Sequence, residues 1–411
     1  MTLAKAKENL DTKNTLPHGW NWVLLEDLFD VKQGAAMSPV RRQGIAPHPF
    51  LRTLNVLWGS VDLSNLDQMD FTEDEVASLN LRSGDLLVCE GGDVGRTAIW
   101  RGELDSCLYQ NHIHRLRRRH NNVAPEFYAY WMQAAFKVFQ SYIGKEITTT
   151  IPNLSGGKLK SFMVPLPPTL TEQERIAQIL NERMVAIEKA YAAADVRIEA
   201  AKALPAAYLR QVLPQPGQEL PDGWRWVRLG EVCEFLDSQR VPVNDEERQQ
   251  RIAGRSSSSL YPYYGANGQV GWIDDYIFDE PLILLAEDGG FFGSPERPVA
   301  YKIIGKSWVN NHAHVLRPRN GVDFDFCLHA LAIRPDIGTM VTGNTRPKLN
   351  QEIAAQIPIP LPSLVEQKRI AAMLNERMEA VGEIVQTIQQ ELDAINGLPA
   401  AFLRRAFTGG L

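Results

Sequence analysis

The sequence has little cysteine and no long apolar segment. No Cys-x-x-Cys pair joins any of its four cysteines, Cys89, Cys107, Cys233 and Cys327. Their wide spacing argues against a disulfide framework and against a zinc site, and it favours a reducing compartment. The longest obvious apolar run, residues 282–286, is far too short for a membrane span. The polar segment Met1–Asn14 is unlike a signal peptide. We therefore expect a soluble, cytoplasmic protein.

Positive charge is also scarce. The formal net charge of the 411 residues is −6. Residues 214–364 account for most of it, with 14 basic against 19 acidic side chains. This charge does not by itself indicate a nucleic-acid-binding protein. If the chain reads DNA, it needs local basic faces or a partner that supplies positive charge.

Sequence motifs of common nucleotide chemistry are missing. Gly305-Lys306-Ser307 matches the end of a phosphate-binding loop, but Ala300 stands where the first glycine is required. Neither a Gly-x-Gly-x-x-Gly run after a strand nor the Asn/Asp-Pro-Pro-Tyr/Phe tetrapeptide of adenine methyltransferases occurs. The acidic residues beside glycine pairs, Glu90 and Glu287-Asp288, fit turns better than catalysis, since no nucleophile accompanies them. We expect no catalytic residue, no metal and no cofactor in this chain.

The chain does contain the same segments twice, about 200 residues apart. The repeated pairs are Leu16–Trp22 with Leu220–Trp226, Pro165–Pro167 with Pro360–Pro362, Glu172–Ala177 with Glu366–Ala371, Leu180–Met184 with Leu374–Met378, and Leu204–Arg210 with Leu398–Arg404. This period is too long for a solenoid repeat, which runs about 20–50 residues. It indicates a duplicated unit made of a domain and a helix.

The repeat divides the chain into four blocks. Residues 1–170 and 214–364 read as two similar globular domains of mixed, strand-rich α/β structure, with buried strands at 85–89 and 281–285. Residues 171–213 and 365–411 read as two long helices. The domain interiors, about 32–105 and 236–305, show little mutual similarity. The flanking motifs, here called the frame, are duplicated, whereas the domain interiors, here called the filling, differ.

The two predicted helices carry matching heptad seams, with steps of four and three residues. The seams consist of Leu180, Met184, Ile187, Tyr191, Ala194, Ile198 and Ala201, and of Leu374, Met378, Val381, Val385, Ile388, Leu392 and Ile395. Such seams are typical of coiled coils, so we expect an antiparallel pair related by a pseudo-twofold axis. The alternative is that each helix packs only on its own domain. Thr171 and Ser363 are the predicted N-caps.

Several polar segments suit contacts with nucleic acid. They include the basic run Arg115–His120, glycine-rich loops in both halves, and Asn-His segments that occur at matching places. The candidate DNA contacts are Arg52, Asn55, Arg96, Asn111, His112, Arg115, Arg117, Tyr264, Asn267, Asn311, His312 and Arg317. Solvated strand ends and hairpin turns are the alternative interpretations. Metal binding by the paired histidines is disfavoured, because no further ligand lies at a suitable spacing.

Taken together, the doubled Leu-Pro-x-Gly-Trp entry, Asn-x-His strand, Pro-Leu-Pro exit and Glu-Gln-x-Arg-Ile-Ala helix start resemble the specificity (S) subunit of type I restriction–modification enzymes. The resemblance covers nearly the whole chain. It implies a non-catalytic subunit for phage defence, whose two target-recognition domains read a bipartite, asymmetric sequence in double-stranded DNA. It also implies that the helices act as a spacer and dock two methyltransferase subunits, and that restriction subunits join them. S-adenosylmethionine, ATP and Mg are then expected in the partner subunits.

Two other functions stay open from the sequence. One is a stand-alone DNA-modifying enzyme, which the missing motifs oppose. The other is an adaptor whose two heads bind proteins. The acidic second half departs from what a DNA reader needs and suggests that DNA affinity appears only with the methyltransferase subunits bound.

Overall fold

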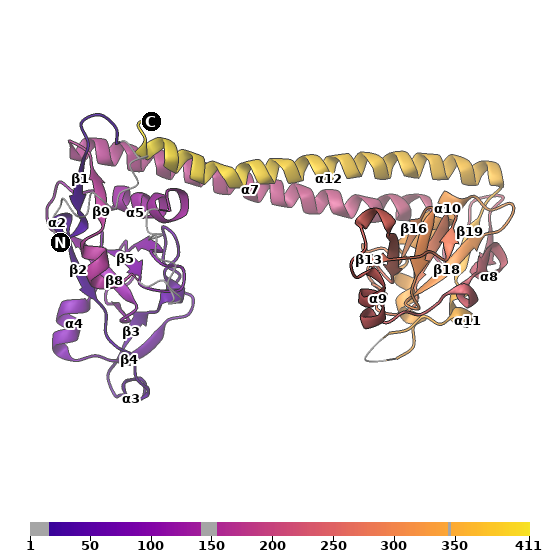
Figure 1. The fold of residues 1–411 in the computed structure, drawn as a ribbon, viewed down its shortest axis with the longest axis horizontal. Helices are drawn as coiled ribbons and strands as arrows, with labels where there is room; N and C mark the ends of the chain where they lie inside the picture. The colour runs from indigo at the N-terminus through magenta and orange to yellow at the C-terminus, as the bar shows by residue number, and fades with distance from the viewer. Residues whose placement is uncertain (1–15, 141–153, 344–346) are drawn as a thin grey trace. The chain divides into compact units, whose positions relative to one another are not determined.

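The computed structural model describes residues 16–140, 154–343 and 347–411. The chain forms two compact units: the first comprises residues 1–193 and 392–411, and the second comprises residues 194–391. The long helices α7 (Leu170–Val212) and α12 (Leu364–Phe407) each contribute a segment to both units. Figure 1 draws each as one continuous helix. Among the described residues, no helix has the length and apolar character needed to span a membrane.

The duplicated entry and exit motifs close each unit on itself. In the first unit the Trp20 N–H donates to the Pro17 carbonyl (3.1 Å), and Gly19 has a φ of +84°. A positive φ at this turn position favours glycine, which explains the motif. Strand β1 (Asn21–Leu24) then pairs antiparallel with β9 (Met163–Leu166), so Trp22 lies opposite Pro165. The entry strand therefore meets the exit strand.

The second unit repeats this closure. Trp224 donates to the Pro221 carbonyl (3.1 Å) across a turn in which Gly223 has a φ of +81°. Strand β10 (Arg225–Arg228) pairs with β19 (Pro358–Leu361), which places Trp226 opposite Pro360. The repeated sequence thus encodes a repeated clasp.

A mixed α/β core fills the first unit. Its central sheet has the order β2-β8-β5-β6, and a smaller sheet has the order β4-β3-β7. The strands are β2 (Phe29–Gln33), β3 (Pro47–Leu51), β4 (Asp67–Asp70), β5 (Leu86–Cys89), β6 (Thr97–Ile99), β7 (Leu108–Tyr109) and β8 (Ile113–Arg118). The shorter helices are α2 (Leu25–Leu28), α3 (Pro39–Arg42), α4 (Glu73–Leu79), α5 (Pro125–Gln133) and α6 (Gly156–Lys160).

The second unit has the same plan with a different periphery. Its central sheet has the order β11-β18-β15-β16, beside a sheet in the order β13-β12-β17-β14. The strands are β11 (Cys233–Phe235), β12 (Tyr261–Gly265), β13 (Gly268–Ile273), β14 (Phe278–Asp279), β15 (Leu282–Ala286), β16 (Ala300–Ile303), β17 (Lys306–Val309) and β18 (Ala313–Pro318). The helices are α8 (Leu229–Val232), α9 (Asp245–Ile252), α10 (Phe324–Ala332) and α11 (Gln351–Ala354).

The central strand of each unit is buried on both faces, as its apolar run predicts. In β5, Leu86 and Val88 face the core under α5, whereas Leu87 and Cys89 face the smaller sheet. Strand β15 alternates in the same way, with Ile283 and Leu285 on one side and Leu282 and Leu284 on the other. Two apolar layers therefore pack against the two faces of each central strand.

Within each unit, a segment of α7 packs antiparallel to a segment of α12. In the first unit the Arg183 guanidinium lies over the Phe402 ring, and Arg175 reaches the Leu411 carbonyl. In the second unit Arg377 lies over Tyr208, and Arg197 pairs with Glu391 (2.9 Å). The residues of α7 ascend while their α12 partners descend, which defines the antiparallel direction.

Most of the predicted seam is buried or half-buried. Fully buried are Leu180, Ala194, Ile198, Ala201, Leu374, Val381, Ile388, Leu392 and Ile395, and half-buried are Met184, Ile187, Met378 and Val385. Tyr191 departs from the prediction, because 42% of it is exposed. A tyrosine has an apolar ring and a polar hydroxyl group, which favours contact with water.

The first helix begins earlier than predicted. The Thr169 hydroxyl, not Thr171, accepts a hydrogen bond from a first-turn amide, that of Glu172 (3.2 Å). In the second helix the Ser363 hydroxyl accepts from Glu366, as predicted (3.4 Å). Thr169 is the residue that the repeat aligns with Ser363. Both helices also continue through an internal proline, Pro205 or Pro399. The predicted fold class is confirmed: a mixed α/β chain with an internal repeat and two long, antiparallel-paired helices.

A buried glutamine joins α7 to α5 in the first unit. The Gln173 side chain is 1% exposed, accepts from the Ala124 N–H (2.9 Å) and donates to the Asn122 carbonyl (3.2 Å). We predict that Gln173→Ala lowers the free energy of unfolding of the first unit by about 1–3 kcal/mol, since two buried backbone groups lose their partners. Hydrogen exchange at the Ala124 amide measures this. Gln178→Ala, on the exposed side of the same helix, should stay within about 0.5 kcal/mol; equal effects would contradict the account.

Candidate nucleic-acid interface

Each unit has a cluster of polar side chains at the same end of its central sheet. The cluster contains Glu90 and His114 in the first unit, and Glu287 and His314 in the second. In the second unit Glu287 follows β15: its N–H donates to the His312 carbonyl (2.9 Å), and its carbonyl accepts from Leu349 (2.7 Å). In the first unit Glu90 follows β5 and makes the same two contacts, with His112 and Leu154 (both 2.9 Å). The backbone places these glutamates equivalently, so the clusters can be compared residue by residue.

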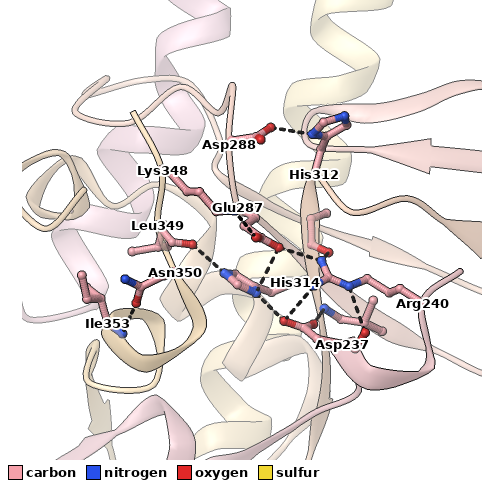
Figure 2. A network of polar contacts seen from close by, with 12 residues as sticks. Asp237, Arg240, Glu287, Asp288, His312, His314, Lys348, Leu349, Asn350 and Ile353 are labelled. Carbon is pink, nitrogen blue, oxygen red and sulfur yellow. Dashed lines mark hydrogen bonds and ion pairs between the residues drawn. The ribbon is translucent and has the colours of Figure 1, made fainter. Parts of the chain in front are cut away.

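His314 is the centre of the cluster in the second unit, which Figure 2 shows. It lies on β18 and is 1% exposed. Its Nδ1 lies 2.6 Å from the Asp237 carboxylate, and its Nε2 lies 2.7 Å from the Leu349 carbonyl. Both ring nitrogens of His314 therefore have an oxygen partner, and these two contacts fix the orientation of the ring.

Two cations neutralise the carboxylates around His314. Arg240 donates to Glu287 (2.7 Å) and to the Ala313 carbonyl (2.7 Å), and Lys348 lies 3.0 Å from the other Glu287 oxygen. Asp237, Glu287 and His314 hold potential ligand atoms within 4.8 Å of one another. Because Arg240 and Lys348 already compensate the negative charge there, a metal would have to displace them. The cluster is therefore a charge-balanced network that links the loops after β11 and β15 to the start of α11 (Figure 2).

The first unit has the same frame with less charge. The pairing of β2 with β8 places Gln33 opposite His114, and the continuation of β11 places Asp237 beside His314. The Gln33 amide donates to Glu90 (3.2 Å) and to the Asn111 carbonyl (2.8 Å). Burial, above all, lowers the pKa of His114, although Glu90 and the Leu154 backbone oppose that shift. Burial therefore favours the uncharged form of the His114 imidazole.

Exposed side chains rim both clusters. Asn111 and His112 precede β8, and Asn311 and His312 precede β18. His112 is 60% exposed and lies 3.9 Å from Glu90, whereas His312 pairs with Asp288 at 2.7 Å. In the hairpin between β12 and β13, Asn267 is exposed and donates to the Gly289 carbonyl (2.8 Å), and Tyr264 is half-buried. These six predicted residues lie beside the polar cluster of their unit.

The predicted arginines have partners inside the protein. Arg115 is 3% exposed and pairs with Asp30 (2.7 Å). Arg117 makes two hydrogen bonds to Asp85, which raise its pKa. Arg317 pairs with Glu280 and Glu234, which likewise raise its pKa. The basic run was predicted to suit DNA phosphate. Two of its members, Arg115 and Arg117, lie on the same face of β8 and pair with acidic residues of the first unit.

The remaining predicted contacts are also engaged within the first unit. Asn55 is completely buried, accepts from Arg52 N–H (2.9 Å) and donates to the carbonyls of Asp62 and Asn65 (both 3.0 Å). Arg96 donates to the Thr53 carbonyl (2.6 Å), and Arg52 lies 3.4 Å from Asp67. Asn55 is thus a turn-forming residue, because its amide satisfies backbone groups that would otherwise be unpaired.

Sequence reasoning missed Asp237, Arg240 and Lys348. Asp237 and Arg240 lie three residues apart, Lys348 follows Arg240 by 108 residues, and the three belong to no recognisable motif. The sequence does indicate the cluster residues that both units share, because His114 recurs as His314 and Glu90 recurs as Glu287. Asp237, Arg240 and Lys348 occur only in the second unit, so the repeat gives no sequence signal for them.

Solved structures share this fold. A chain from a structural study of complex assembly and conformational transition of the type I R-M system aligns with a TM-score of 0.74 and 21% identity, covering 97% of this chain and 100% of the other. The HsdS subunit from Thermoanaerobacter tengcongensis aligns with a TM-score of 0.62 and 20% identity, covering 97% and 99%. These likenesses define the architecture: a doubled α/β domain with two long helices.

The type I restriction modification DNA specificity domain matches residues 17–190 and again residues 221–394. The chain therefore belongs to this family. It is 23% identical over 419 residues to a putative type I restriction enzyme MjaX specificity subunit from Methanocaldococcus jannaschii, covering 96% of this chain and 94% of that one. It is also 33% identical over 150 residues, 36% of each chain, to a putative type I restriction enzyme specificity subunit from Haemophilus influenzae.

Family membership decides between the functions that the sequence left open. The chain is a DNA-recognition specificity subunit of a type I restriction–modification system, and such subunits are not catalytic. Family membership therefore argues against the two alternatives, a stand-alone DNA-modifying enzyme and a two-headed protein adaptor. The doubled family match also agrees with the doubled clasp and cluster described above.

The charged cluster of the second unit should be sensitive to loss of one member. We predict that Asp237→Ala lowers the free energy of unfolding of the second unit by about 3–5 kcal/mol, because the buried His314 ring and the Val315 N–H lose their carboxylate partner and Arg240 loses a counter-charge. Denaturant unfolding followed by hydrogen exchange in β18 measures the loss. Asp279→Ala, at an exposed position of β14, should change it by less than about 0.5 kcal/mol. A similar, small effect of both substitutions would show that the cluster does not hold the sheet end.

Proposed function

We propose that the two units read the two different halves of a bipartite, asymmetric target in double-stranded DNA. The observation that supports this most strongly is a single frame used twice with unlike filling. Clasp, central sheet and cluster recur, whereas the loops beside the cluster differ. A repeated scaffold with different loops is suited to two related tasks that differ in sequence.

The difference is plainest next to the smaller sheets. Strand β3 pairs parallel with β7 at Leu51, and β12 pairs parallel with β17 at Tyr264, so these residues are equivalent. The chain then forms a 3-10 turn with Leu54 48% exposed in the first unit, but the hairpin turn with exposed Asn267 in the second. An apolar and an amide side chain favour different base edges in the major groove.

The DNA contacts we propose are the members of the predicted set that lie beside the clusters: Asn111, His112, Tyr264, Asn267, Asn311 and His312. The arginines and Asn55 instead contact acidic side chains or backbone carbonyls of their own unit. Since the second block carries more acidic than basic residues, we propose that the full affinity for DNA appears in the assembled complex, where partner subunits supply the positive charge.

The duplicated outer faces of α7 and α12 are the proposed docking sites for two methyltransferase subunits. Glu172 pairs with Arg175, and Glu366 pairs with Arg369, at 2.8 and 2.7 Å. The exposed Glu182 and Glu376 also recur on these helices. Two copies of one surface fit two copies of one partner. The seam residues stabilise the helix pair that presents this surface.

Restriction subunits are the further partners in this proposal. S-adenosylmethionine, ATP and Mg would bind in the partner subunits, which perform the methylation and cleavage, and the complex would work in the cytoplasm, where it meets its DNA. The four-block division at residues 170, 213 and 364 is the corresponding proposal for the functional domains.

An exchange of one filling tests the reading function. We predict that replacing residues 236–305 with the corresponding segment of another family member changes only one half of the methylated sequence. The clasp and the helices are kept, so the complex still assembles. Single-molecule methylome sequencing of cells that also express the cognate methyltransferase subunit reads out the target. A change in both halves, or in neither, would count against separate reading by the two units.

The gap between the half-sites is the second test. We propose that α7 and α12, which have residues in both units, set this gap. Removing one heptad from each helix, residues 185–191 and 379–385, keeps the seams in phase and shortens each helix by about 10 Å. The methylated sequence should keep both half-sites and lose about one to three base pairs of gap. Altered half-sites with the original gap would refute the role of the helices.

A further inference from the structure

Two short exposed segments occupy equivalent places in units whose surroundings differ. The carbonyl of His112 accepts from Glu90 N–H, and the carbonyl of His312 accepts from Glu287 N–H, both at 2.9 Å. Each histidine follows an asparagine, Asn111 or Asn311, and each lies directly before the strand next to the central one. The Asn-His pair is therefore the same surface element presented twice.

The backbone under each pair is fixed, and its side chains are exposed (His112, Asn311) or half-buried (Asn111, His312). The Asn111 N–H donates to the Ala35 carbonyl (2.8 Å), and its carbonyl accepts from the Gln33 amide (2.8 Å). In the second unit the His312 N–H donates to the Asn310 side chain (2.9 Å). His112 is 60% exposed and His312 is 36% exposed. Rigid backbone with accessible donors is what a recurring contact requires.

The elements beside the pairs are not shared. Asn267 reaches the Gly289 carbonyl, which neighbours the Asp288 partner of His312. At the equivalent turn of the first unit, Arg96 holds the Thr53 carbonyl and Leu54 is exposed. Each unit thus places a common pair next to an individual turn.

Two unlike half-sites share their sugar–phosphate backbone and differ in their bases. Amide and imidazole N–H groups donate readily to phosphate oxygens, and such contacts fix position without reading sequence. Given the function proposed above, we infer that Asn111 with His112, and Asn311 with His312, bind DNA phosphate groups at both half-sites, while the neighbouring turns read the bases. The duplicated pairs set the register of each unit on the duplex.

Lysine substitution tests for a phosphate at this place. In the complex assembled with the methyltransferase subunits, His112→Lys combined with His312→Lys adds a full charge at each pair. The slope of log Kd against log salt, measured on a duplex that carries the target, should steepen by about 0.9 for each lysine. An unchanged slope would overturn the inference, because it would show that no phosphate lies within reach.

Alanine substitution tests for sequence-independent contact. Asn111→Ala combined with Asn311→Ala should weaken binding on the order of tenfold, and equally for the target duplex and for one with scrambled half-sites. The methylated sequence should stay the same. Asn267→Ala is the matched control, and it should relax the sequence of one half-site only. A changed target sequence in the double alanine variant would make the pairs base readers and overturn the inference.

A third measurement separates this inference from the function on which it rests. Mass photometry without DNA shows whether the alanine variants still assemble with the methyltransferase subunits, and unchanged assembly is expected. Lost assembly would place the pairs at the protein partner instead, which overturns the inference and leaves the proposed reading function intact. If the wild-type complex methylates no bipartite target, the proposed function itself fails.

Discussion

The fold depends on an exchange of helix ends between two homologous cores. The first unit is completed by the end of α12, where Phe407 packs edge-on against Phe127 and Trp131, with ring centroids 5.3 and 5.1 Å apart. The second is completed by the end of α7, where Leu209 joins the core that contains Leu374. Each helix therefore begins in one unit and ends in the other, so neither core is finished without the other half of the chain. Hydrophobic burial at these ends fixes the helices that carry the repeat.

The clusters at the sheet ends show how one frame supports two different surfaces. The shared histidine, glutamate and leucine positions hold the same strands and loops together. The second unit then adds Asp237, Arg240 and Lys348, whereas the first uses the neutral Gln33. Two networks that differ by three charged side chains thus accompany the same backbone contacts of Glu90 and Glu287. This allows the loops above them to diverge without loss of the common support.

The sequence predicted the frame better than the surface. Heptad spacing, the turn glycines and the repeated entry and exit motifs are local patterns, and the helices, clasps and buried strands follow from them directly. Arg115, Arg117 and Asn55 were expected at DNA but lie against Asp30, Asp85 and backbone carbonyls. Their partners are 85, 32 and 7 residues away, so only the folded sheet and turns bring them together. Thr169 was overlooked as the helix cap although the repeat aligns it with Ser363.

The central claim is that a doubled scaffold presents two unlike readers of DNA. The most direct measurement is single-molecule methylome sequencing of a strain that expresses this chain unaltered with its cognate methyltransferase subunit. The account predicts adenine methylation in a motif of two different short sequences separated by a gap of fixed length and unspecified bases. A continuous motif, or one with two identical inverted halves, would contradict it, because two units with different loops would then have read the same bases.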